Sequence, residues 1–171
     1  MDKVAKHTSG EAELLQTWQR RCREAQFAHY QEAERLGKLN IWLGIPVIAL
    51  TALVSTSVFA SLADDGQQDP QLQLLTGFLS VLAAVLASLQ TFMKFSERAE
   101  QHRSVGARYG STKRQLETLT VLSARQQASN TQFEQIQQEL DSISAEAPGI
   151  PRRTFSQVHK VLNQLDQQRT T

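Results

Sequence analysis

A group of cationic and aromatic side chains follows the second apolar block of the chain and could bind an anionic ligand. An arginine guanidinium offers paired N–H donors to a phosphate, and a tyrosine ring can stack on a base. Arg98, His102 and Tyr109 recur on one stripe of a predicted helix. Lipid headgroups, or the acidic residues Glu32 and Glu34, are alternative partners for these charges. The candidate coupling or ligand-sensing residues are Arg98, His102, Arg103, Arg108 and Tyr109.

The rest of the sequence gives no pattern for catalysis or metal binding. Serines and threonines are abundant, but no nucleophile stands in a cluster with a base. His29 and His102 are too few for a metal site, and no further cysteine or histidine stands at ligand spacing. The net charge of +1 gives no bulk attraction to nucleic acid. We therefore expect no enzyme activity, no cofactor, no metal and no nucleic-acid partner.

Two uncharged apolar blocks, residues 41–62 and 72–93, must position these side chains. As helices, each would be about 33 Å long, which matches the hydrocarbon core of a bilayer. A buried hairpin in a soluble core is the alternative, but soluble helices of this length normally carry a polar stripe. The blocks predict a transmembrane hairpin in contact with lipid.

The charges flanking the blocks predict the orientation of the hairpin. The connecting loop, residues 63–71, has three aspartates and no lysine or arginine, whereas Arg35, Lys38 and Lys94 flank the blocks on the other side. By the positive-inside rule, both termini lie in the cytoplasm and the loop lies outside the inner membrane. The lone Cys22 then lies on the reducing side.

The remaining segments, residues 1–40 and 94–171, predict cytoplasmic helical arms. No Gly, Pro or Asn lies between Phe92 and Arg103, so block two is expected to continue as one helix to about residue 124. Further helices are predicted over about 130–146, capped by Ser129 or Asn130, and over about 154–168. The fold class is all-α, a two-helix transmembrane hairpin continuing into a cytoplasmic helical bundle. One face of the first arm is expected to pack on another helix, through Trp18, Cys22, Ala25, His29, Glu32 and Leu36.

Small and hydroxyl residues in the blocks could mediate assembly. One hairpin cannot enclose water, so a pore needs several copies, and a small-xxx-small row lets helices approach closely. The alternatives are that these rows only pack the hairpin itself, and that the hydroxyls bond their own backbone. The candidate pore or assembly residues are Thr51, Ser55, Ser80, Ala84, Ser88 and Thr91.

The aspartates of the loop are candidates for an acidic ring at the outer mouth of such a pore. Asp64, Asp65 and Asp69, repeated around an oligomer, would attract cations. The alternative is that they only solvate a tight turn outside the membrane.

Several segments resemble the SLATT family, two-helix membrane effector domains linked to bacterial conflict systems. They are "TW" followed by Arg20 and Arg21, "AHYQEAERL", "LGIPVIALTALVSTSVF", "LQTFMKFSERAEQHRSVGARY" and "APGIP". The resemblance covers roughly residues 14–155. It implies a homo-oligomeric effector that is thought to form pores in anti-phage defence by abortive infection. It also implies a trigger, either a nucleotide second messenger or a soluble sensor or synthase partner.

Two functions therefore remain open at the level of the sequence. The first is a membrane effector that opens a pore or disrupts the membrane when its cytoplasmic helices are switched. The second is a non-conducting membrane anchor or scaffold whose polar, heptad-like arms recruit a soluble partner.

Overall fold

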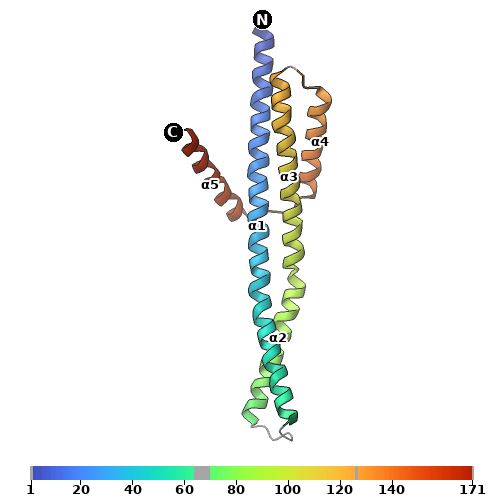
Figure 1. Ribbon diagram of the computed structural model, residues 1–171, viewed down its shortest axis with the longest axis vertical. Helices are drawn as coiled ribbons and strands as arrows, with labels where there is room; N and C mark the ends of the chain where they lie inside the picture. The colour runs from blue at the N-terminus through green and yellow to red at the C-terminus, as the bar shows by residue number, and fades with distance from the viewer. Residues whose placement is uncertain (1, 64–69, 126, 171) are drawn as a thin grey trace. The chain divides into compact units, whose positions relative to one another are not determined.

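The structure is a computed structural model that describes residues 2–63, 70–125 and 127–170. Most of the described residues are helical and none lies in a strand, which confirms the predicted all-α class (Figure 1). Contacts divide the chain into a hairpin unit, Arg35–Arg98, and an arm unit, Met1–Glu34 with Ala99–Thr171. The helices are α1 (Asp2–Ala63), α2 (Pro70–Met93), α3 (Phe95–Ala124), α4 (Asn130–Glu146) and α5 (Arg152–Thr170).

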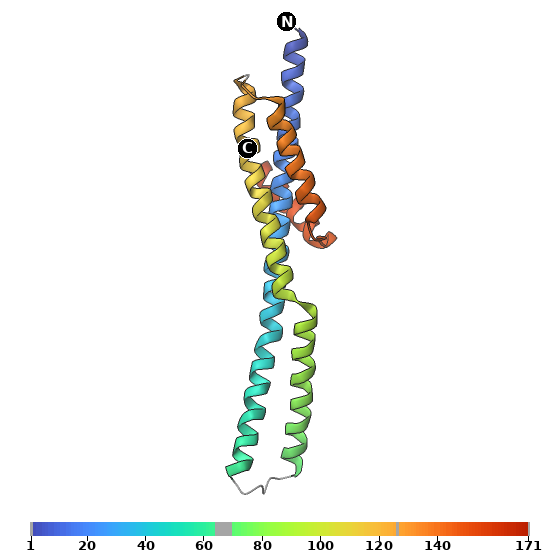
Figure 2. The same cartoon turned by 90° about the vertical axis from the view of Figure 1, so that its right-hand side faces the viewer.

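The hairpin unit packs the second part of α1 along α2 (Figure 2). The less exposed residues of α2 recur at intervals of three and four, and Ala83, at 4% exposure, lies at the centre of this stripe. A stripe of this spacing keeps two helices in contact along their length. On the two helices the stripes consist of Asn40, Leu43, Gly44, Val47, Leu50, Val54 and Ser57, and of Thr76, Leu79, Ser80, Ala83, Leu86, Ala87 and Gln90.

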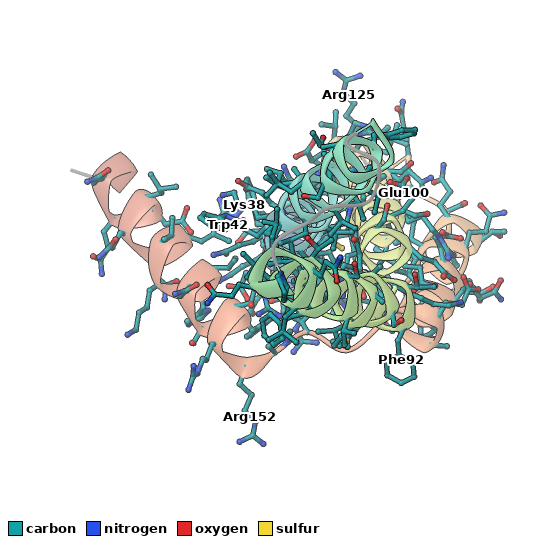
Figure 3. All side chains as sticks on the ribbon, turned by 90° about the horizontal axis from the view of Figure 1, so that it is seen from below. Lys38, Trp42, Phe92, Glu100, Arg125 and Arg152 are labelled. Atoms are coloured by element: carbon teal, nitrogen blue, oxygen red, sulfur yellow. The ribbon has the colours of Figure 1, made fainter. Side chains whose placement is uncertain are left out.

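The rest of the hairpin surface is apolar and exposed. Of the most apolar stretch of each helix, 0% is buried in α1 and 6% in α2. Trp42 and Phe92 are 77% and 83% exposed, and Figure 3 shows the Phe92 ring pointing away from the ribbon. A core helix of a soluble protein would bury most of such a stretch, so the hairpin has the surface of a membrane-spanning element.

One expectation from the sequence is wrong, because α2 does not run without interruption into the following helix. α2 ends at Met93, α3 begins at Phe95, and Lys94 between them has a φ of 48°. The Lys94 carbonyl accepts the first hydrogen bond of α3, from the Arg98 N–H at 3.0 Å. A left-handed residue commonly ends a helix, but it is usually glycine, so the sequence held no residue type that marks this stop.

The arm unit packs α3 against both α1 and α4. Its core contains Leu15, Cys22, Leu116, Leu119 and Ile136. Two glycines of α3 allow a close approach to α1, since a Cβ at Gly110 would lie 2.6 Å from Gln26 Nε2 and one at Gly106 3.3 Å from the Tyr30 ring. α4 is capped by Ser129, one of the two caps that the sequence predicted, and the Ser129 hydroxyl and the Gln132 side chain form a capping box.

α5 packs against α1 through a smaller cluster of Ala28, Val158 and Leu162. At the start of α5, the buried Thr154 hydroxyl donates to Glu32 Oε2 at 2.9 Å. Other polar contacts between the same helices include the ion pair of Arg23 and Asp166. The apolar face of α5 is only partly covered, because Phe155 and Leu165 remain 44% and 48% exposed.

Candidate functional site

Two histidines meet in the interior of the arm unit. His29 of α1 and His102 of α3 are each 3% exposed, and their Nδ1 atoms lie 2.9 Å apart. One imidazole must donate and the other accept in this hydrogen bond, so at least one ring is neutral. Burial, and then the neighbouring His102, lower the pKa of His29 from 6.5 to about 4. Among the described residues, no group of three His, Cys, Asp or Glu side chains could hold a metal ion here.

Tyr109 connects this pair to α4. Its ring stacks on His29 with centroids 5.8 Å apart and an interplanar angle of 23°. Its hydroxyl lies 3.3 Å from the Ser144 hydroxyl of α4. A substitution of Tyr109 would therefore disturb both the packing of α3 on α1 and the contact of α3 with α4.

Arg108, the next candidate, is held by acidic residues of α4. Its guanidinium donates to Glu146 at 2.5 Å and to Glu139 at 3.3 Å, and also reaches the Ser142 hydroxyl at 3.2 Å. The hydrogen bond to Glu146 raises the pKa of Arg108. The acidic partners that the sequence suggested, Glu32 and Glu34, are thus not the ones that hold this arginine.

The other two candidates of this group lie apart from it. Arg103 is exposed and pairs with Glu100 of its own helix at 3.0 Å. Arg98 is exposed and belongs to the hairpin unit. The structure brings His102 and Tyr109 together around His29 and pairs Arg108 of α3 with acidic residues of α4, but it does not gather the five residues into one ligand site.

A different site lies between the four helices of the arm unit. A cavity of about 540 Å³ is lined by aromatic residues from three helices, Trp18 of α1, Tyr109 of α3 and Phe155 of α5. Arg21 of α1 and Asp141 of α4 add one charge of each sign. Cys22 also lines it, and burial, partly offset by Lys113, raises the pKa of its thiol to about 11, so the thiol stays protonated. Apart from Tyr109, the sequence reasoning missed this site, because its residues come from four segments.

The hydroxyl groups proposed for pore lining bond their own backbone. Thr51 donates to the Val47 carbonyl at 2.9 Å, Ser55 to Thr51 at 2.8 Å and Ser80 to Thr76 at 2.8 Å. Ser88 and Thr91 do the same, with the Ala84 and Ala87 carbonyls at 2.8 and 3.0 Å. In this structure, these hydroxyls therefore donate to carbonyls of their own helix, which is one of the alternatives that the sequence left open.

The small-residue row of α2 lies mostly on the exposed surface. Ser80 is half-buried at the edge of the α1–α2 contact, whereas Ala84 and Ser88 are exposed. Ala83, one residue away, is buried in that contact. The candidate acidic ring, Asp64, Asp65 and Asp69, lies outside the described residues.

A polar contact between the two spans was not anticipated. Gln90 Nε2 lies 3.4 Å from Asn40 Oδ1, and a Cβ at Gly44 would lie 3.3 Å from the same nitrogen. Gly44 therefore makes room for the Gln90 amide in the interface between α1 and α2. The signal was in the sequence, since Gln90 is a strongly polar residue near the end of an apolar block.

Comparison with known proteins gives one family. Residues 17–171 match the profile of SLATT_4, described as SMODS and SLOG-associating 2TM effector domain family 4. Neither the curated proteins nor the solved structures gave a match. The match covers most of the chain and takes in both units.

Proposed function

The chain belongs to the SLATT_4 family of SMODS and SLOG-associating 2TM effector domains, and from this premise we propose that its hairpins associate to form a pore or to disrupt the membrane. The family description and the two apolar helices indicate a membrane effector of conflict systems. The finer proposal is an anti-phage response ending in abortive infection. The hairpin would span the inner membrane with both termini in the cytoplasm, and the cytoplasmic helices would switch it.

The observation that carries the proposal is the exposed small-residue row on α2. Ala83 and Ala87 face α1, so the hairpin already uses one small row for its own packing. Ala84 and Ser88 are exposed on the neighbouring stripe, where no part of the described hairpin covers them. In lipid, small residues let helices approach closely, so this stripe fits a second hairpin.

A pore built this way would be weakly polar, because the described hydroxyls are already bonded to the backbone. Ion selection would then depend on the mouths, where the loop aspartates are the proposed cation-attracting ring. The trigger is proposed to be a nucleotide second messenger or a soluble sensor or synthase partner, which acts on the arm unit.

Reconstitution in liposomes tests this function. The purified protein is placed in liposomes that hold a small dye and a potassium reporter, and leakage is followed with and without candidate nucleotides. Ala84→Leu with Ser88→Leu should abolish leakage by keeping hairpins apart. Val81→Leu with Val85→Leu is the matched control, because Val81 and Val85 are already large, apolar and 64% and 58% exposed. Tight liposomes under every triggering condition, with insertion verified, would overturn the proposal.

The second candidate function is a non-conducting anchor or scaffold, which one observation favours. A groove of about 260 Å³ between α1 and α5 is lined by Phe27, Tyr30, Val161 and Leu165, and these four side chains are 38% to 53% exposed. Exposed apolar surface of this kind can bind a soluble partner. Overproduction separates the two functions, because a pore depolarises cells and a scaffold does not.

A further inference from the structure

We propose that the cavity between α1, α3, α4 and α5 binds a planar aromatic ligand that carries an anionic group at one end and an N–H donor at the other. The proposal concerns binding at a site distinct from the hairpin. Only its consequence, a change in membrane leakage, rests on the proposed function.

The walls of the cavity suit a flat ring. Trp18 and Tyr109 are half-buried, and Phe155 is 44% exposed at the cavity. Three aromatic side chains from three helices line the cavity, and aromatic rings favour stacked or edge-on contacts with another ring. The volume of about 540 Å³ is in the range of small-molecule sites.

The charges of the cavity are arranged for a ligand with two different ends. Arg21 and Asp141 line the same cavity with exposed side chains, and within the described part of the chain neither makes an ion pair or a side-chain hydrogen bond, so both are available to a ligand. The arginines near Arg21 on α1 do form ion pairs, Arg20 with Glu24 at 3.1 Å and Arg23 with Asp166. A guanidinium binds carboxylate or phosphate in a bidentate manner, and a carboxylate accepts from an amino group.

The cavity is placed to influence the helices that form it. Tyr109, one of its walls, stacks on His29, and His29 hydrogen-bonds His102 of α3. A ring stacked on Tyr109 would therefore bear on the contact between α1 and α3. A ligand that bridges Arg21 and Asp141 would also bind α1 to α4 and favour the arrangement in which the two helices are close.

Adenosine 5′-monophosphate is the probe, because it has a ring, a phosphate and an amino group. The full chain is prepared in nanodiscs with Trp42→Phe, which leaves Trp18 as the only tryptophan. Saturable quenching of Trp18 fluorescence reports binding. Adenosine lacks the phosphate, purine riboside 5′-monophosphate lacks the amino group and has no other N–H on that edge, and ribose 5-phosphate lacks the ring, so each should bind at least 10-fold more weakly.

Variants test whether Arg21 binds the phosphate of the probe and Asp141 its amino group. Arg21→Ala should weaken the monophosphate at least 10-fold and leave adenosine unchanged, whereas Arg20→Ala, the matched control, should change neither. Asp141→Leu, which has no acceptor, should remove the preference for the adenine ring over the unsubstituted purine ring. Absence of saturable quenching, or equal effects of Arg21→Ala and Arg20→Ala, would overturn the site. If binding is intact but the liposomes do not leak in response, the site stands and its proposed link to the pore fails, while the pore itself is tested separately by the other triggering conditions.

Discussion

His29 of α1 and His102 of α3 share a hydrogen bond of 2.9 Å between their Nδ1 atoms, and both rings are buried. Only one of these two Nδ1 atoms can carry a hydrogen while the bond is intact. When both Nδ1 atoms carry hydrogen, two donors face each other at that distance and the contact is lost. The packing of α1 on α3 therefore depends on the protonation state of the pair.

The arm unit should lose stability in mild acid. The pKa of His29 is about 4 in the folded protein and about 6.5 when unfolded, so the unfolded state binds the proton more readily. The stabilisation is complete above about pH 6.5 and is lost as the pH falls towards 4. Between pH 7 and 5 we expect a loss of roughly 2 kcal/mol in the free energy of unfolding. Thermal unfolding in detergent at each pH measures it.

The variant His29→Gln with His102→Gln tests the origin of this loss. Two glutamine amides can hydrogen-bond without titrating, so the pH dependence between 7 and 5 should flatten. His159→Gln is the control, since its side chain is 47% exposed, and the decline should persist in it. A decline of equal size in the double variant would assign the acid sensitivity to other groups.

Arg108 should matter for the docking of α4, and Arg103 should not. Arg108 contacts Glu139, Ser142 and Glu146 of α4, so Arg108→Ala should raise hydrogen exchange along α4. Among the described residues, Arg103 forms an ion pair only with Glu100 of its own helix, and exposed ion pairs contribute little to stability. Equal exchange in the two variants would show that α4 is held by its apolar face alone.

Thr154 should anchor α5 through the buried Glu32. Thr154→Val keeps the shape but removes the 2.9 Å hydrogen bond to the carboxylate, and we expect a loss of about 1.5–3 kcal/mol. Thr118→Val is the control, because within the part of the chain that the structure describes the Thr118 hydroxyl donates only to the Arg114 carbonyl of its own helix. Limited proteolysis of α5 and thermal unfolding should separate the two variants, and similar behaviour would contradict the anchor.

Local signals in the sequence predicted much of the fold. The uncharged blocks marked both spans, and Ser129 or Asn130 was predicted to cap α4, which the structure shows capped by Ser129. Helical spacing found the buried face of α1, where Cys22, His29 and Glu32 are all buried. These features lie within one helix or at its end, so periodicity and side-chain chemistry suffice to show them.

The candidate sites were harder to predict, because they depend on contacts between distant segments. His29 and His102 were each noted, but their meeting depends on how α1 and α3 approach each other at Gly106 and Gly110. The pairing of Arg108 with α4 depends on the turn between α3 and α4 in the same way. Spacing along one helix cannot show which residue of another helix lies opposite.

A substitution at Lys94 tests the helix end that the sequence did not predict, the end of α2 at Met93. Lys94→Gly should stabilise the fold by about 0.5–1 kcal/mol, because a left-handed backbone is strained for lysine and not for glycine. Lys113→Gly is the matched control within α3, and it should cost about 1 kcal/mol. Both changes remove one ion pair, from Lys94 to Glu97 at 3.0 Å and from Lys113 to Glu117 at 3.3 Å. If both variants are destabilised equally in thermal unfolding, the helix runs through Lys94, as the sequence alone predicts.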